Sequence, residues 1–262
     1  MLSRFRFARW ILAFTVLATG AYMTAPPARA QATIDPDARS VLTSMSGYLG
    51  GLKSFSVDYT AVDEVVTREG QKLQFLHSGT ITVQRPDRLH AIRRGAAGVA
   101  ELFLDGKHLI LSSKDAGAYL QFDASSIDSA VDVVHNFGFD APGADLLVSK
   151  PLDSSQTDMS SGVHVGMTYI DGVKVHQLAF RGTDVDWQLW VTDGDRRLPV
   201  RYVITTKGMS GAPEFTLQLT HWNTAPPTDP AQFTFVPTAD AKKLDPTAVT
   251  VNATDDLVIK GK

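Results

Sequence analysis

The 262-residue sequence contains no cysteine. A thiol nucleophile, a thiolate metal site and a lipid anchor on an N-terminal cysteine are therefore all excluded. The lack of cysteine also means that the chain has no disulfide. An exported domain of this length does not require one, because it can bury a sizeable hydrophobic core.

The motifs of common enzyme classes are missing as well. No G-x-S-x-G, H-E-x-x-H, P-loop or G-x-G-x-x-G pattern is present. The segment Gly208-Met209-Ser210-Gly211 has the wrong spacing for a serine nucleophile and lies in a predicted turn. The sequence therefore predicts a non-catalytic protein without a cofactor. A hydrolase with a non-standard site is the less favoured alternative.

The seven histidines show no short spacing typical of metal ligands. His164 and His176 share one predicted hairpin, but a two-residue turn at Asp171-Gly172 places the two rings on opposite faces of that hairpin. We therefore expect that they share no metal ion. Asp193 and Asp195 flank a glycine, but two carboxylates are too few for Ca²⁺, and a turn is the better interpretation.

The chain has only one short hydrophobic run near its start, from Trp10 to Ala21, and a membrane span needs ~20 apolar residues. Three arginines precede this run, and Ala28-Arg29-Ala30 follows it as an A-x-A cleavage site. These three parts predict a secretory signal peptide over residues 1–30 and a soluble protein in the periplasm. An N-terminal membrane anchor is the alternative.

Strong positive charge is also absent. The formal net charge of the whole chain is −3. Without residues 1–30, which hold four arginines and no acid, 21 basic and 28 acidic residues remain, a net charge of −7. No basic run stands out, so we expect no nucleic-acid partner. The remaining length suits one domain over residues 31–246 with an extension over 247–262, and we expect a monomer.

Alternating apolar residues predict several β-hairpins. The chain is organised around Val185 to Val203, read as two strands joined at Asp193-Gly194. The predicted register sets Leu189 opposite Leu198, Trp187 opposite Val200 and Val185 opposite Tyr202 on one apolar face, with Asp186 opposite Arg201 and Trp190 opposite Arg197 on the other. Pro199 suggests an edge strand or a bulge.

Two long runs, Ser54 to Thr67 and Gln71 to Gln84, form another predicted hairpin. A three-residue loop at Arg68-Glu69-Gly70 gathers the apolar residues on one face. That face also receives Asp63 and His77, either near its rim or as a grip for a polar headgroup. A hairpin around Asp105-Gly106 places four leucines together, Leu102, Leu104, Leu109 and Leu111.

Two segments have helical periodicity. Asp35 and Pro36 predict a helix start, and Gly50-Gly51 predicts its end. Residues 125–139 repeat apolar positions at three and four, with Ser125 or Ser126 as the cap. Either helix would be a lid over an open sheet or one packed wall of an ordinary core, and both interpretations remain open.

Four segments carry a resemblance to a known superfamily: Trp187 to Trp190, Arg197 to Arg201, Phe233 to Pro237 and Tyr48 to Phe55. They resemble the periplasmic lipoprotein-localisation carriers of the LolA/LolB type, in particular a group of uncharacterised predicted periplasmic proteins. The resemblance implies an α+β, mainly β, fold: a curved antiparallel sheet forming an unclosed half-barrel, with helices plugging its concave face.

The resemblance also implies an apolar cavity for acyl chains between sheet and helices, and a lipid or lipoprotein as the ligand, with a membrane-associated donor or acceptor. We expect fourteen residues to line this cavity: Phe55, Val57, Tyr59, Phe75, Ile81, Leu102, Leu104, Leu109, Leu111, Val134, Phe137, Trp187, Leu189 and Val200. The alternative function is a module with a filled core that binds a protein or an envelope polymer on its surface.

Overall fold

The computed structural model describes residues 33–249, except 97, 140 and 154–157. The predicted signal peptide and most of the predicted C-terminal extension lie outside these residues. In the described part, two α-helices and three short 3₁₀ helices accompany the strands: α1 (Pro36–Gly51), α2 (Ile127–Asn136), η1 (Ala144–Leu146), η2 (Pro230–Phe233) and η3 (Pro246–Ala248).

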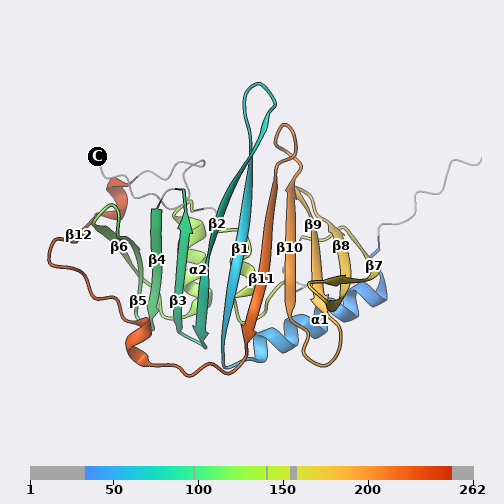
Figure 1. Ribbon diagram of the computed structural model, residues 1–262, viewed down its shortest axis with the longest axis horizontal. Coiled ribbons are helices and arrows are strands. Elements are labelled where there is room, and N and C mark those ends of the chain that lie inside the picture. The colour runs from blue at the N-terminus through green and yellow to red at the C-terminus, as the bar shows by residue number, and fades with distance from the viewer. Residues whose placement is uncertain (1–32, 97, 140, 154–157, 250–262) are drawn as a thin grey trace, which may run out of the picture. The chain divides into compact units, whose positions relative to one another are not determined.

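The described strands form one twelve-stranded sheet (Figure 1). Their bounds are β1 (Ser54–Val66), β2 (Lys72–Gln84), β3 (Arg88–Gly95), β4 (Gly98–Asp105), β5 (His108–Ser113), β6 (Ala118–Asp123), β7 (Ser161–Ile170), β8 (Val173–Arg181), β9 (Val185–Thr192), β10 (Pro199–Thr206), β11 (Glu214–Asn223) and β12 (Lys242–Lys243). The spatial order is β12-β6-β5-β4-β3-β2-β1-β11-β10-β9-β8-β7. Two sequential meanders therefore meet where β1 pairs with β11.

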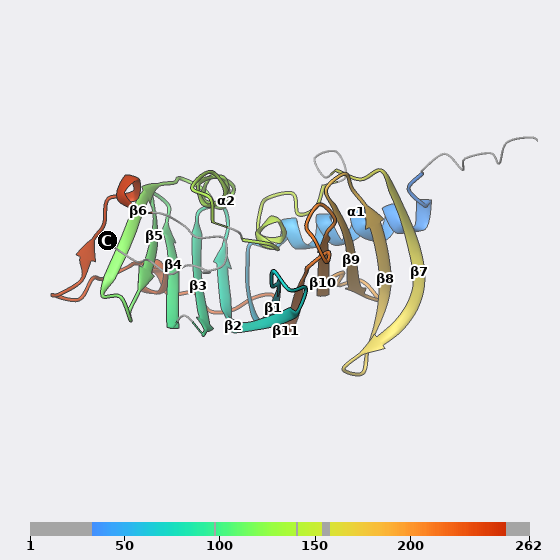
Figure 2. The ribbon, with the colours of Figure 1, turned by 90° about the horizontal axis from the view of Figure 1, so that it is seen from above.

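The sheet is an unclosed half-barrel, because its end strands β7 and β12 do not pair with each other. Both α-helices lie on the same side of the sheet, α2 over the β2–β3 region and α1 over the β7–β10 region (Figure 2). Their buried residues join those of the sheet in one hydrophobic core. The predicted fold class is confirmed.

The predicted hairpin register of β1 and β2 is also confirmed. The Thr67 amide donates to the Gln71 carbonyl at 2.8 Å, and Gly70 has the positive φ of 84° that the three-residue loop requires. This loop length fixes every residue pair of the hairpin, from Val66–Lys72 beside the loop to Ser54–Gln84 at the far end. The four leucines of β4 and β5 share one face as expected, in the pairs Leu102–Leu111 and Leu104–Leu109.

Both predicted helices are present, with the expected caps. The Asp35 carboxylate accepts a hydrogen bond from the Asp37 amide, and Pro36 occupies the first helical turn. Ser126 caps α2 in a reciprocal pair with Ser129. Because both helix starts are held by local side-chain contacts, sequence patterns were sufficient to locate them.

The predicted register of the β9–β10 hairpin is wrong. Leu189 pairs with Tyr202 instead of Leu198, and Trp187 pairs with Ile204 instead of Val200. The connection is longer than two residues, because the Asp193 amide donates to the Lys174 carbonyl on β8 and the sheet has a bulge after Pro199, which has no amide proton. The shift is by four residues, so the apolar and polar faces are preserved.

The polar face of this hairpin changes partners accordingly. Trp190 lies opposite Arg201, whose guanidinium carbon is 5.7 Å from the indole centroid. Asp186 forms an ion pair with Lys207 at 3.1 Å. The predicted pairs of Asp186 with Arg201 and of Trp190 with Arg197 are therefore wrong.

The expected separation of His164 and His176 is wrong as well. A β-bulge at Val165 shifts the pairing of the first residues of β7, Ser161 to His164, by one position. His164 therefore pairs with Leu178 and lies on the same face as His176. The two rings are 3.1 Å apart between Nε2 of His164 and Nδ1 of His176. His176 Nε2 lies 3.2 Å from an Asp193 carboxylate oxygen. His164, His176 and Asp193 therefore form a chain of polar contacts, whereas the sequence predicted that the two histidines lie on opposite faces.

Candidate functional site

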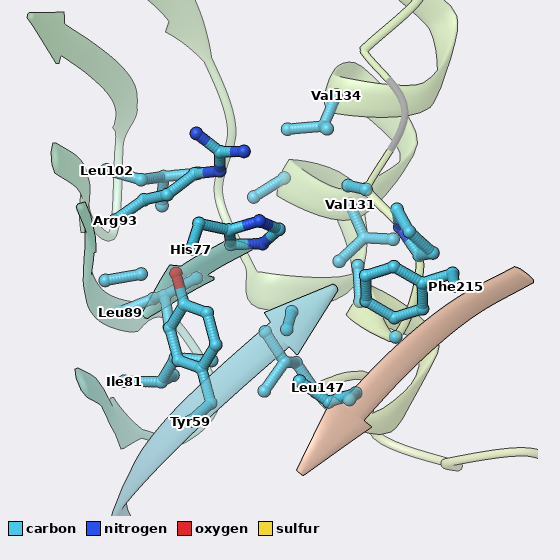
Figure 3. Close-up of a pocket in the computed structure, with 18 of the residues that line it drawn as sticks. Tyr59, His77, Ile81, Leu89, Arg93, Leu102, Val131, Val134, Leu147 and Phe215 are labelled. Carbon is cyan, nitrogen blue, oxygen red and sulfur yellow. The ribbon is translucent and has the colours of Figure 1, made fainter. Parts of the chain in front are cut away.

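A pocket of about 180 Å³ lies on the inner face of the sheet (Figure 3). Its floor comes from β1, β2, β3, β4 and β11, and its other wall comes from α2 and the segment that follows it. The residues that line it are Tyr59, Ala61, Asp63, His77, Ile81, Leu89, Ala91, Arg93, Leu102, Ala130, Val131, Val134, Ala141, Pro142, Gly143, Ala144, Leu147, Phe215 and Leu217. Most of these side chains are apolar.

The sheet opens this space by placing small residues on the inner face. Ala61 and Ala91 leave room where larger side chains would fill the pocket, and Gly79 allows the Tyr59 ring to lie close to the sheet. At Gly79 a Cβ atom would lie 1.6 Å from the Ile92 carbonyl oxygen and 3.1 Å from the Tyr59 ring, so only glycine fits. The Tyr59 ring covers this glycine and donates its hydroxyl proton to the Ile92 carbonyl at 3.2 Å.

A second pocket of about 110 Å³ adjoins the first. The two share four lining residues, Tyr59, Ala91, Arg93 and Leu102, and Leu111 contributes to the second one alone. Movement of the shared side chains would therefore connect two spaces that are separate in the structure. A third depression, of about 270 Å³, lies near Trp187 and has a mixed polar and apolar lining.

Three ionisable side chains line the main pocket, Asp63, His77 and Arg93, and Figure 3 shows His77 and Arg93 beside each other. Asp63 Oδ2 is 3.1 Å from His77 Nδ1 and 4.0 Å from Arg93 Nη2. The Tyr59 and His77 rings meet edge to face with centroids 5.9 Å apart. These residues give an otherwise apolar pocket one polar end.

The short helix η1 behind the pocket carries a buried acid. Burial raises the pKa of Asp145 to about 6, although the Tyr202 hydroxyl, which donates to Asp145 Oδ2 at 3.4 Å, lowers it. The pKa of Tyr202 is raised well above 10, also by burial and then by the adjacent carboxylate. Asp145 Oδ1 is buried without a hydrogen-bond partner among residues 33–249 with the gaps named above. The neighbouring Ala144 and Leu147 line the pocket.

The segment that carries η1 is fastened to the sheet and to α2. Arg85 Nη1 donates to the Leu147 carbonyl at 2.7 Å. The Ser149 amide and hydroxyl both donate to the Asp128 carboxylate, at 2.7 and 2.6 Å. Besides the apolar packing of α2, this wall of the pocket is held by a small number of polar contacts, whereas the sheet wall is held by continuous strand pairing.

The fourteen residues predicted to line a cavity are distributed over several environments. Tyr59, Ile81, Leu102 and Val134 line the main pocket, Leu111 the second, and Trp187 the third. Phe55, Val57, Leu104, Leu109, Leu189 and Val200 are buried in the core. Phe137 packs against Phe122 and Phe139, and Phe75 is 43% exposed.

Several pocket residues were missed by the sequence reasoning. Leu89, Ala91 and Arg93 alternate along β3 and could have been found from that period-2 pattern. Phe215 and Leu217 come from β11, whose pairing with β1 spans most of the chain and leaves no local signal. Within the described ranges there is no group of three or more metal-ligating side chains.

Residues 38–245 match the family model described as a predicted periplasmic protein, DUF2092. The chain belongs to this family. The family that the sequence resembles is therefore confirmed. No protein in the curated comparison matches the chain. Among the residues that the structure describes, no helix is long and apolar enough to cross a membrane.

Several solved structures have similar chains. Lipoprotein LppX of Mycobacterium tuberculosis is 14% identical with a TM-score of 0.48, over 74% of this chain and 100% of that one. LprF of Mycobacterium bovis is 18% identical with a TM-score of 0.48, over 75% and 97%. A LolA superfamily protein of Nitrosomonas europaea is 12% identical with a TM-score of 0.37, over 76% and 97%.

Proposed function

We propose that this protein binds a single acyl chain or a similar apolar ligand in the pocket between the sheet and α2, without catalysis, as a carrier or sensor in the periplasm. The observation that carries the proposal is the pocket itself, an apolar space of about 180 Å³ with one polar end. A pocket of this composition binds by removing hydrocarbon from water and needs no reactive group.

The size of the pocket limits the affinity. A cavity of ~150 Å³ holds a benzene-sized group, so the main pocket accepts a chain segment of roughly six carbons. Each buried methylene contributes ~0.8 kcal/mol, a gross total of about 5 kcal/mol, which corresponds to a Kd of a few hundred micromolar. Micromolar binding needs roughly ten methylenes. The adjoining space of about 110 Å³ supplies this extra volume when the shared side chains Tyr59 and Leu102 move.

The pocket wall formed by α2 and η1 is the part that moves in this proposal. Its few fastenings, such as Arg85 to the Leu147 carbonyl, separate more easily than paired strands. The sheet wall contributes fixed side chains from β1, β2 and β3. A ligand would therefore enter by displacing the helical wall.

The alternative of a filled core has one supporting observation. Much of the inner face is fully packed, with Phe55, Leu104 and Leu109 completely buried. In that case the pocket would be an incidental packing gap, and the outer surface would carry the function. Ligand binding decides between the two.

The test is a cavity-filling substitution with a matched control. Ala91→Phe places a ring in the wall shared by both pockets, and Ala179→Phe makes the same change on β8, away from them. We expect Ala91→Phe to weaken binding of methyl dodecanoate at least tenfold and Ala179→Phe to leave it unchanged, measured by isothermal titration calorimetry. Equal binding by both variants and the unaltered protein would contradict the pocket assignment.

Location and ligand are tested on protein isolated from the periplasmic fraction. We expect its N-terminus at Gln31, because residues 1–30 would be removed as a signal peptide, and the remaining chain to behave as one monomeric domain. Native mass spectrometry should detect a co-purified lipid or acylated peptide. An intact N-terminus in the membrane fraction would instead support an anchor.

A further inference from the structure

We propose that Asp63, His77 and Arg93 form a headgroup site, and that this site selects single-chain amphiphiles with a carboxylate head, such as free fatty acids, over their uncharged esters. The inference rests on the proposed function, because it takes the apolar part of the pocket as the place of the chain. It goes further by naming the chemical class of the ligand and the residues that select it.

The three side chains are brought together by the register of three adjacent strands. On the inner face, Asp63 of β1 lies two positions from Ala61, which pairs with His77 of β2, and His77 pairs in turn with Gly95 of β3. Arg93 precedes this glycine by two residues and therefore shares its face. Figure 3 shows His77 and Arg93 close together at one end of the pocket, with Tyr59 beside them and the valines of α2 opposite.

These three side chains lie in a mostly buried, apolar environment, where an ionised group costs free energy. Their side chains are only 10% (His77), 14% (Arg93) and 24% (Asp63) exposed, and the pocket around them is apolar. Buried polar groups normally form hydrogen bonds that offset their loss of water. In the described part of the chain, Asp63 Oδ2 and His77 Nδ1 are buried and their 3.1 Å contact lacks hydrogen-bond geometry. These two atoms therefore retain unused hydrogen-bonding capacity inside the pocket.

The charge of the cluster determines which headgroups it accepts. Arg93 is a permanent cation, and its Nη2 forms an ion pair with Asp63 Oδ2 at 4.0 Å. The net charge of the three side chains is zero when the His77 imidazole is neutral and +1 when it is protonated. A cationic headgroup would be attracted by Asp63 and repelled by Arg93, whereas an anion can accept hydrogen bonds from the guanidinium and from an imidazole N–H.

A carboxylate fits this site better than larger anions. The planar guanidinium matches the two oxygens of a carboxylate, and the pocket of about 180 Å³ has space for one chain rather than two. The carboxylate would lie at the polar end and its chain would extend along Ile81 and Leu89 toward α2. An ester of the same chain keeps the apolar contacts and loses the charge-assisted ones.

The experiment compares dodecanoate with methyl dodecanoate by isothermal titration calorimetry on the purified full chain. We expect the unaltered protein to bind dodecanoate at least tenfold more tightly, which corresponds to ~1.4 kcal/mol. Arg93→Met should remove this preference by weakening dodecanoate about tenfold while leaving the ester unchanged. Arg93→Lys, which keeps the charge and loses the planar fork, should give an intermediate preference.

Arg94→Met is the matched control. Arg94 is the next residue along β3, is exposed and pairs with Ser78 and Val99 on the outer face. We expect it to bind both ligands like the unaltered protein. His77→Gln should reduce the preference in part, and circular dichroism and thermal unfolding of each variant verify that it is folded.

The outcomes separate this inference from the proposed function. Equal affinity for the acid and the ester in the unaltered protein, or an Arg93→Met variant that keeps the preference, overturns the headgroup site while the acyl pocket stands. Failure of both ligands to bind overturns the acyl pocket and the headgroup site together. A preference for the acid that disappears in Arg93→Met and persists in Arg94→Met supports the carboxylate assignment.

Discussion

Replacement of Asp145 by asparagine is expected to stabilise the protein at neutral pH and not at acidic pH. Asp145 is buried in η1, and burial raises its pKa from 3.8 to about 6. The folded protein therefore holds this proton more tightly than the unfolded chain does. The contribution of the protonated acid to stability is fully present below pH ~4 and is lost as the pH rises through about 6.

The magnitude follows from the two pKa values. Each tenfold change in the acid constant corresponds to ~1.4 kcal/mol, so ionising Asp145 in the folded state costs about 3 kcal/mol at pH 7.5. An asparagine at this position would carry no charge, and its side-chain oxygen can still accept the hydrogen bond from the Tyr202 hydroxyl. We therefore expect the free energy of unfolding of Asp145→Asn to exceed that of the unaltered protein by up to ~3 kcal/mol at pH 7.5 and by much less at pH 4.5.

The assay is urea denaturation between pH 4.5 and 8, followed by tryptophan fluorescence. Asp132→Asn, an exposed position on α2, serves as the control and should show no pH-dependent gain. Tyr202→Phe should move the loss of stability to higher pH, because the hydroxyl's hydrogen bond lowers the pKa of Asp145. A free-energy difference between Asp145→Asn and the unaltered protein that stays constant across this pH range would refute the reasoning.

Three further predictions concern the framework around the pocket. Leu104→Ala should lower the free energy of unfolding by ~2–5 kcal/mol, because the side chain is completely buried, and a loss below ~1 kcal/mol in urea titrations would contradict the packing. Ser126→Ala should cost about 1 kcal/mol by removing the α2 cap, while Ser126→Asp should retain most of the stability. Deletion of Val165 should remove the β7 bulge and leave His164 opposite Leu178, on the face of His176, because the residues on both sides of the bulge keep their partners. A contact between the two imidazoles that persists in NMR spectra would verify this, and its loss would count against it.

The parts of the fold that could be predicted are those with local signals. The loop at Arg68-Glu69-Gly70 determined the β1–β2 register because a wrong loop length would scatter the apolar residues over both faces. The start of α1 was visible because Asp35 and Pro36 act within their own turn. Alternation in β4 and β5 was equally informative, since both strands present one leucine face to the core.

The errors occurred where contacts distant in sequence decide the local structure. Asp193-Gly194 looks like a two-residue turn, but the Asp193 amide donates to the Lys174 carbonyl of β8 and the β9–β10 ladder has a bulge after Pro199, so the connection is longer. The bulge at Val165 is followed by Gly166, whose φ is 145°, and this glycine within the strand pattern is a signal that the sequence reasoning did not use. Leu104 was expected to line a cavity and is completely buried, because sequence patterns identify the inner face and not the space left above it.

The pairing of β1 with β11 has a consequence for folding. Each meander consists of hairpins between strands adjacent in sequence, which form quickly, whereas Asp63–Phe215 and its neighbouring pairs close a loop of about 150 residues. Tyr59 and Ala61 on one side of this seam and Leu217 on the other belong to the same pocket wall. The pocket therefore comes into existence only when the last long strand has docked, and a ligand that occupies it would hold the two halves of the sheet together.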